Sequence, residues 1–392
     1  MLKWVKSITV FLKSNLLAII LMVFFLLDAV NFFIDKAVGL TFANSVSFYI
    51  KGLIQIILLC YLFFKLKDRY LFWLIIVVLM IPMIWCFIYF VQNSTSQNDC
   101  YIMLRYSSKY LFSVILFLSF AELPNSLKKN ALTVFEWIFI LSAILVILSA
   151  LFQISFFSTY GINRFGYKPL IAAQNEISFW WIIGIIYFLR KHELRSSHNN
   201  LLLLFVVGIA GMLLGTKATI IFIFILFFYL LLLSTIDSRF KFWGFIVLIL
   251  SMMLFLYFSG IFGYFLDFYK ERGLLISFTS KRSLLVQERV PVVLSTWCWY
   301  NYLIGGISSI RYLTEMDLID IFMMFGVLGS IGYLFLLWKT LFHFSNKNRA
   351  GWLLGFSFIF VGGFGGHVFQ SGVCAIYLAL GCLYLQHKHV SV

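Results

Sequence analysis

The feature that most constrains this chain is a series of continuous apolar runs, each about 20 residues long, which matches the hydrocarbon core of a bilayer when the run is helical. The runs do not alternate polar and apolar residues, as the strands of a membrane β-barrel do. Hydrophobic residues make up 62% of the chain and charged residues 11%, whereas soluble domains carry about 25% charged residues. The sequence therefore predicts an all-α polytopic integral membrane protein, with residues 1–392 forming a single membrane domain.

Twelve apolar runs are predicted as membrane spans. We place them at residues 15–34, 45–64, 70–91, 104–121, 131–154, 173–189, 200–215, 218–235, 242–262, 318–338, 351–367 and 370–386. With a cytoplasmic N-terminus, the basic connections KLKDR, LKKN, RKHELR, SRFK and NKNR all fall on the inner side, as the positive-inside rule requires. This arrangement predicts that both termini are cytoplasmic. It also makes residues 263–317, between the ninth and tenth spans, one large outer loop.

The formal net charge of +15 largely reflects this orientation signal, so it does not indicate a nucleic-acid partner. Nearly half of the 30 Lys and Arg residues nevertheless fall on the outer side, where such residues are normally sparse. An anionic ligand at the outer face would explain them. Lipid headgroups or nearby acids are the alternative, which we favour for Lys36, Arg105 and Lys109. The chain has no phosphate-binding glycine loop, dinucleotide fingerprint or metal-ligand spacing, so we expect no cofactor and no metal.

The predicted outer loop concentrates positive charge. Its basic residues include Lys270, Arg272, Lys281, Arg282, Arg289 and Arg311. Arg can hold a phosphate group through two parallel hydrogen bonds, and we single out Arg282 and Arg289 for this role. Trp297 and Trp299 either stack on sugar rings or belong to an interfacial aromatic belt.

Carboxylates close this loop at Glu315, Asp317 and Asp320, where the tenth span begins. Acids in the first turn of a helix are stabilised by its dipole, which is sufficient to explain Asp317 and Asp320. Glu315 precedes the helix, so its side chain can reach a ligand in the aqueous phase and act as a general base. A salt bridge to Arg311, one turn earlier, is the alternative.

Three other outer segments carry candidate ligand-binding residues. Arg164 and Lys168 are four residues apart in the connection STYGINRFGYKPLIAAQNEIS. Lys217 lies in the tight turn Gly-Thr-Lys-Ala, beside a helix N-terminus that favours phosphate, although a snorkelling Lys at a span end has the same pattern. His367, in the glycine-rich stretch GGFGGHVFQ, lies at the outer end of the eleventh span, where a helix or substrate can approach closely.

Two further pairs of residues are left open by the sequence. Asp28 and Glu136 fall inside predicted spans, where ionisable residues are costly and often functional. Pairing with a polar neighbour, without any functional role, is an equally supported alternative. Cys100 and Cys298 both fall on the outer side, so they form either a disulfide or two free thiols.

Four of these features together resemble the O-antigen polymerase and ligase superfamily of bacterial envelope glycosyltransferases. They are the passage RFGYKPLIAAQNEISFW, the turn LLGTKATIIF, the element SKRS at Ser280–Ser283, and Glu315 eleven residues before Gly326 in GVLGS. The plan of about twelve helices is similar too, so the resemblance covers nearly the whole chain and implies a GT-C-like fold. Ligases carry His where this chain has Glu315, and an acid at this place is more similar to polymerases. Lys217 replaces the Arg often found there, which keeps the charge but loses the two-pronged contact.

The resemblance implies an enzyme that joins undecaprenyl-diphosphate-linked oligosaccharide repeat units at the periplasmic face of the bacterial inner membrane. Glu315 would deprotonate the acceptor hydroxyl, and Asp317 would orient this base or bind sugar hydroxyls. Arg311 and His367 belong to the expected substrate-binding residues.

The same resemblance implies two groups of phosphate-binding cations. Lys217, Arg282 and Arg289 would stabilise the leaving diphosphate of the donor. Arg164 and Lys168 would hold the second lipid diphosphate or acidic sugars.

The expected partners are the lipid-linked oligosaccharides, membrane lipids, and a chain-length regulator and flippase of the same pathway. Two alternatives remain at this point. One is an O-antigen ligase, which transfers finished polymer to the lipid A core. The other is a lipid-linked oligosaccharide flippase, which would place its charges inside the helix bundle rather than in outer loops.

Overall fold

The computed structural model describes residues 2–38, 42–92, 97–160, 165–171, 174–233, 237–279, 282–345 and 347–386. The α-helices in these residues are α1 (Leu2–Val38), α2 (Phe42–Lys65), α3 (Arg69–Val91), α4 (Gln97–Ala121), α5 (Asn125–Leu151), α6 (Gln174–Leu194), α7 (His198–Leu213), α8 (Lys217–Leu233), α9 (Ser238–Phe258), α10 (Ile261–Arg272), α11 (Leu274–Thr279), α12 (Arg282–Ser295), α13 (Trp299–Ile304), α14 (Asp317–Lys339), α15 (Arg349–Gly365) and α16 (Cys374–Gln386). Short 3₁₀ helices include η1 (Ser155–Phe157) and η3 (Ile310–Tyr312). The described residues contain an isolated β-bridge between Ser158 and Tyr167 and no strand, so the all-α prediction is confirmed.

Six helical segments within the described residues are long and apolar enough to cross a membrane. They are Ser14–Lys36, Arg69–Val91, Asp99–Ala121, Asn125–Leu151, Ser238–Phe258 and Asp317–Lys339. Shorter apolar helices are His198–Leu213, Lys217–Leu232, Arg349–Phe364 and Cys374–Gln386. The chain is therefore an all-α membrane protein. In the described part of the chain, a helix also covers most of each of the twelve predicted spans.

Several helices begin at the short polar connections that the sequence predicts, because a side chain there caps the first turn. Ser197 accepts a hydrogen bond from the backbone N–H of Asn200 at the start of α7. Asn348 caps α15 in the same way through the N–H of Gly351. Such caps satisfy N–H groups that have no partner inside the helix.

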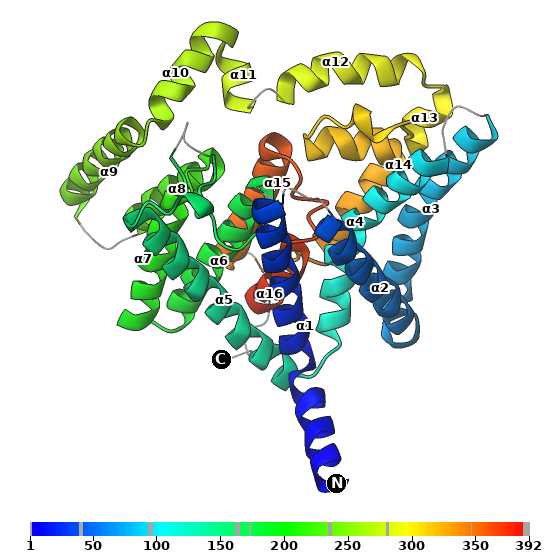
Figure 1. The fold of residues 1–392 in the computed structure, drawn as a ribbon, viewed down its shortest axis with the longest axis horizontal. Helices are drawn as coiled ribbons and strands as arrows, with labels where there is room; N and C mark the ends of the chain where they lie inside the picture. Colours follow the sequence, from blue (N-terminus) through cyan, green and yellow to red (C-terminus); the bar gives the residue numbers. More distant parts are fainter. Residues whose placement is uncertain are drawn as a thin grey trace.

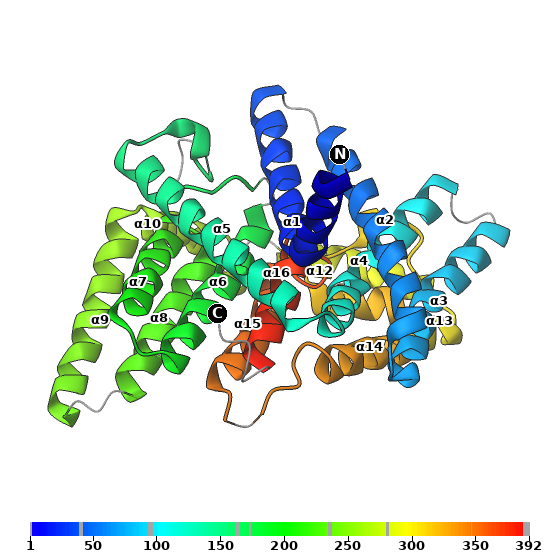
Figure 2. The same ribbon diagram turned by 90° about the horizontal axis from the view of Figure 1, so that it is seen from below.

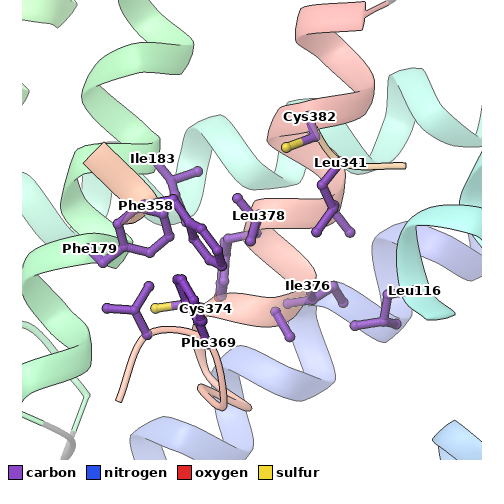
Figure 3. Packing of buried hydrophobic residues seen from close by; sticks show 14 of the residues in the cluster. Leu116, Phe179, Ile183, Leu341, Phe358, Phe369, Cys374, Ile376, Leu378 and Cys382 are labelled. Atoms are coloured by element: carbon purple, nitrogen blue, oxygen red, sulfur yellow. The ribbon is translucent and has the colours of Figure 1, made fainter. Parts of the chain in front are cut away.

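The centre of the molecule is α16, which packs against α4, α6 and α15. All its residues from Cys374 to Leu385 are buried. Figure 3 shows its side chains against Phe179 and Ile183 of α6 and Phe358 of α15. Close packing rather than water exclusion drives such contacts inside a membrane. Helix α9 is the opposite case: it has no buried residue and lies at the edge of the bundle beside α8 and α10 (Figure 2).

Residues 263–317, predicted as a large loop, are mostly helical. Helices α10, α11, α12 and α13 cross one end of the bundle, from α9 to the ends of α3 and α4 (Figure 1). The crossing is anchored where α13 meets α14. Gly305 and Gly326 both have positive φ, and a Cβ on Gly326 would lie 2.4 Å from the backbone nitrogen of Gly305. Only glycine allows this contact, which also breaks the regular helix of α14 at Gly326.

The connection between α15 and α16 is buried rather than exposed. Val368, Phe369, Gln370 and Ser371 are all buried, although they are not helical. Irregular backbone inside a membrane protein is tolerated where protein groups satisfy it. We call residues 366–373 the buried turn, and the partners of its backbone define the candidate site.

Candidate functional site

Three side chains that the sequence analysis singled out separately meet at one point. Arg282 begins α12, Glu315 lies two residues before the start of α14, and His367 lies in the buried turn. The Nε atom of Arg282 lies 3.7 Å from Oε2 of Glu315. The Nε2 atom of His367 lies 3.9 Å from the same oxygen. Glu315 therefore faces Arg282 and His367, rather than forming the salt bridge with Arg311 that was the alternative.

Glu315 is the most accessible member of this group. Its side chain is 42% exposed, against 11% for Arg282 and 29% for His367. A carboxylate that is open on one side and flanked by a guanidinium and an imidazole on the other can contact a ligand without leaving its partners. This arrangement suits a group that binds or deprotonates a ligand from the aqueous side.

The backbone at this point is strained. Glu315 and His367 have φ values of +61° and +62°, in the left-handed region that non-glycine residues rarely adopt. Gly366, next to His367 in the chain, packs directly against the backbone of Glu315: a Cβ on Gly366 would lie 2.0 Å from the carbonyl oxygen of Glu315. Strain of this kind costs about 1–3 kcal/mol per residue and collects at functional sites.

Asp317 holds the buried turn in place. Its Oδ1 accepts a hydrogen bond from the N–H of His367 (2.9 Å), and its Oδ2 accepts from Val368 (2.6 Å) and Phe369 (2.9 Å). The residue is fully buried. Both carboxylate oxygens are thus used by backbone donors, so the geometry favours a positioning role for Asp317. The first-turn helix position explains only part of why an acid is present here.

Asp320 and Arg289 hold the segment on the other side of Glu315. Oδ1 of the buried Asp320 accepts from the backbone N–H (2.6 Å) and the hydroxyl (2.9 Å) of Thr314. The guanidinium of Arg289 donates to the carbonyl of Leu313. Arg289 therefore supports the loop that presents Glu315, and it is not among the described residues that line the cavity beside Arg282.

That cavity has a volume of about 390 Å³ and lies between α8, α9, α10, α12 and α15. Apolar side chains form most of its wall, including Ile221 of α8, Leu256 of α9 and Phe364 of α15. Lys217 and Arg282 are the cationic residues among its described lining. The cavity thus combines an apolar wall with two positive charges, and Arg282 joins it to Glu315.

Lys217 is the first residue of α8, as the tight turn before it predicts. Its ammonium donates to the carbonyl of Ser277 in α11 (2.7 Å) and lies 5.5 Å from the ring centroid of Phe265. Only a glycine fits at position 215, because a Cβ added there would lie 2.2 Å from the carbonyl oxygen of Phe165. Lys217 is therefore a fixed cation in the cavity wall and links the bundle to the helices that cover it.

His367 is held from both sides of its ring. Its Nδ1 lies 3.1 Å from the side-chain amide nitrogen of Gln370, and its Nε2 faces Glu315. Burial lowers the pKa of His367 from its ordinary value, and the nearby Arg282 lowers it further, while Glu315 opposes both. The imidazole is consequently neutral at pH 7, which leaves Arg282 as the positive charge beside the carboxylate.

The remaining predicted site residues that the structure describes are not part of this group. Lys168 is buried against α1, with its ammonium 5.2 Å from the ring centroid of Phe32. Arg311 is exposed on η3. Arg164 lies outside the described residues. Trp297 is buried, and its indole N–H donates to the carbonyl of Gly306 (2.8 Å), so it supports the contact between α13 and α14.

The ionisable residues inside spans are paired. Asp28 forms a salt bridge with Lys51 (2.8 Å). Glu136 accepts from Lys191 (2.6 Å) and from the hydroxyl of Tyr187 (2.7 Å). These contacts match the alternative of quiet pairing, although the partners are not the near neighbours in sequence.

Sequence reasoning missed several polar residues around the buried turn. Ser371 donates to Glu176, which also interacts electrostatically with Lys109 and Lys51. Gln370 orients His367. These contacts join residues that are far apart in the chain, so no local pattern could have indicated them. Among the described residues, no three His, Cys, Asp or Glu side chains converge as metal ligands would.

The geometry can therefore bind an amphiphile with a negatively charged head. Its apolar part would occupy the cavity, its anionic group would meet Lys217 and Arg282, and a neighbouring hydroxyl would lie beside Glu315. Comparisons of the chain with protein-family models, with curated proteins and with solved structures gave no match.

Proposed function

We propose that the protein is a polysaccharide polymerase of a bacterial envelope, which joins oligosaccharide repeat units carried on undecaprenyl diphosphate. The observation that carries the proposal is the contact between Glu315 and Arg282 at an apolar cavity of about 390 Å³. A polyprenyl diphosphate needs an apolar wall with a cationic group at one end, and this cavity has both. The resemblance of SKRS, LLGTKATIIF and the Glu315 position to O-antigen polymerases supports the same class.

In this proposal, the growing chain on its lipid diphosphate is the donor. Its diphosphate meets Lys217 and Arg282, and part of its lipid lies along the apolar cavity wall. The C–O bond between the sugar and the diphosphate breaks during transfer, so negative charge develops on the leaving oxygen. Fixed cations stabilise that charge without having to reorganise. Lys217 is held by Ser277 and Arg282 by its burial and its contact with Glu315.

The acceptor is the terminal sugar of a second lipid-linked repeat unit. One hydroxyl of this sugar attacks the anomeric carbon of the donor, and Glu315 takes its proton. The products are a longer chain on the acceptor lipid and free undecaprenyl diphosphate. Because the diphosphate is already a good leaving group, the reaction needs no nucleotide and no metal. His367 and Arg282 hold the carboxylate at the point of attack.

The proposal includes a topology. The twelve predicted spans would cross the inner membrane with both termini in the cytoplasm, and residues 263–317 would lie in the periplasm, as in a GT-C-like fold. Single cysteines introduced at Ser280, in the part of the chain outside the described residues, and at Ser196 test this map with a membrane-impermeant thiol reagent in intact spheroplasts. We expect Ser280→Cys to react and Ser196→Cys to be protected. The reverse result would overturn the orientation.

Reconstituted protein tests the activity directly. Purified protein in lipid vesicles is given undecaprenyl-diphosphate-linked repeat units, and the products are separated by gel electrophoresis. We expect a ladder of chains that differ by one repeat unit. Arg282→Ala should lower the rate roughly a hundredfold, since loss of one donor to a developing anion commonly has this effect. Arg311→Ala is the matched control, because it removes an exposed Arg from the same segment, and its rate should stay near the parent value.

The same assay separates the polymerase from the two other activities. Transfer of preformed polymer to lipid A core, without chain growth, would identify a ligase. Movement of labelled lipid-linked repeat units across the bilayer, without new glycosidic bonds, would identify a flippase. Equal rates for Arg282→Ala and Arg311→Ala in a working polymerase would remove the cavity from the mechanism. A chain-length regulator and a flippase are the protein partners expected in the cell.

A further inference from the structure

Two cysteines that the sequence did not connect lie against each other at one end of the α3–α4 pair. Cys86 is in the last two turns of α3 and Cys100 in the first turn of α4. The thiol of Cys86 lies 3.9 Å from the carbonyl oxygen of Cys100, and the thiol of Cys100 lies 3.6 Å from the carbonyl oxygen of Cys86.

This reciprocal arrangement meets the main requirement for a disulfide. Two cysteines can be bridged only if their Cα atoms are within about 7 Å and their side chains face each other. Here each sulfur lies within 4 Å of the other residue's backbone carbonyl oxygen, so the two side chains face each other at short range. Cys298, the partner that outer location alone suggested for Cys100, is exposed at the start of α13.

We propose that Cys86 and Cys100 form a disulfide that joins α3 to α4 in the mature protein. Both carry free thiols in this structure. The inference concerns covalent modification of the scaffold, and it stands apart from the proposed glycosyl transfer.

The chemistry requires an oxidant, which we take to be the disulfide of a thiol oxidoreductase. Cys100 is partly exposed and Cys86 is buried, so Cys100 reacts first. Its thiolate attacks the oxidant's disulfide, forms a mixed disulfide and releases one thiol of the oxidant. Cys86 then loses its proton and attacks the sulfur of Cys100, which releases the second thiol of the oxidant. Two electrons pass from the two cysteines to the oxidant, and their two protons end on its thiols.

The disulfide would hold in place the part of α3 that donates hydrogen bonds to the region where α13 meets α14. Trp85 donates its indole N–H to the carbonyl of Met324 (2.9 Å), and the hydroxyl of Tyr89 donates to the carbonyl of Gly306 (3.3 Å). Cys86 lies between these two residues in the same helix. A covalent link to α4 would therefore limit the movement of the turn from which both hydrogen bonds are made. Cross-links also stabilise a fold by restricting its unfolded chain.

The end of α3 that holds Cys86 lies at the same end of the bundle as α13 (Figure 1). In the proposed topology this end faces the periplasm, an oxidising compartment in which disulfides persist. The spheroplast labelling described above measures the orientation independently. If this end faces the periplasm and both cysteines are reduced, the disulfide is refuted and the proposed function is not affected. If the polymerase assay shows no activity, the proposed function fails and the disulfide proposal is not affected.

Thiol counting tests the proposal. Cells are lysed into N-ethylmaleimide to block free thiols and prevent later oxidation. The denatured protein is then reduced, and the newly released thiols are tagged with a maleimide-linked polyethylene glycol that retards the band. The chain has six cysteines. We expect two tags on the parent protein and none when reductant is omitted. A parent protein without tags would overturn the proposal.

Single substitutions identify the pair. Cys86→Ser and Cys100→Ser should each abolish both tags, whereas the matched control Cys298→Ser should keep both. Loss of the tags in Cys298→Ser would assign the bond to Cys298 and refute the pair proposed here. If either Ser variant fails to accumulate, mass spectrometry of the unreduced parent protein decides the matter. It should yield a linked peptide that contains Cys86 and Cys100, and detection of both cysteines only as maleimide adducts would refute the bond.

Discussion

Replacing Asp317 by Asn tests the contact that fixes the buried turn against α14. The carboxylate accepts three backbone hydrogen bonds, one on Oδ1 and two on Oδ2. An amide of the same size keeps one oxygen, which can retain the two bonds to Val368 and Phe369. Its NH₂ group then faces the N–H of His367, so this bond is lost and a buried donor has no acceptor.

The size of the effect follows from these contacts. A hydrogen bond to a charged acceptor contributes about 1.5–3 kcal/mol to the free energy of unfolding. Part of the loss is offset, because the neutral amide avoids the desolvation cost of a buried carboxylate. We therefore expect Asp317→Asn to lower the free energy of unfolding by about 1–2 kcal/mol. Asp317→Ala removes all three acceptors and should be more damaging than Asp317→Asn.

Thermal unfolding in detergent and the polymerisation assay should be measured together on the same preparations. We expect Asp317→Asn to lower both the melting temperature and the polymerisation rate, because His367 loses its anchor beside Glu315. The matched control is Asp267→Asn, which changes an exposed acid of α10 and should alter neither quantity. Unchanged stability with complete loss of activity would refute the role of Asp317 in positioning the buried turn, and would support the direct contact with Glu315 or sugar hydroxyls that the resemblance implies.

Three further predictions concern neighbouring residues. Asp320→Asn should keep both hydrogen bonds from Thr314, because they converge on Oδ1, so its melting temperature should fall far less than that of Asp320→Leu. Gly366→Ala should abolish activity and lower stability, because the new Cβ would lie 2.0 Å from the carbonyl oxygen of Glu315. The control Gly208→Ala should be tolerated, because no atom lies within 4 Å of its new Cβ. Burial lowers the pKa of His367, so activity should fall only at a pH below the ordinary range of a histidine, where a second positive charge appears beside the carboxylate. His367→Gln should remove this acid limb from the pH–rate profile.

The membrane helices could be predicted because each apolar run carries its own signal. A run such as 70–91 is long enough to span whatever its neighbours are, and α3 covers all of it. Caps at positions such as Ser197 and Asn348 follow equally local rules. The helical structure of residues 263–317 was not predicted, because these residues are neither continuously apolar nor regularly amphipathic.

The candidate site was predicted in part. Glu315 and Arg282 were found through charge and position, and they do meet in the structure. The role of Asp317 was not apparent, because its partners lie about 50 residues further along the chain. The contact of Cys86 with Cys100 was missed for a related reason: an apolar run indicates that a helix forms, but not which of its faces meets the next helix. The role expected for Lys168 at a second phosphate group stays a prediction, and its side chain lies buried against α1 rather than at the cavity.

The central claim is that Glu315 accepts the proton of the acceptor hydroxyl, and replacing it by Gln tests this most directly. The amide keeps the size of the side chain and one acceptor oxygen but cannot take a proton. Purified Glu315→Gln protein should unfold at the parent temperature and bind undecaprenyl diphosphate as the parent does. Its polymerisation rate should fall about 10²–10⁴-fold, as removal of a general base typically causes, leaving single repeat units without longer chains. A Glu315→Gln enzyme that forms the ladder at the parent rate would contradict the account.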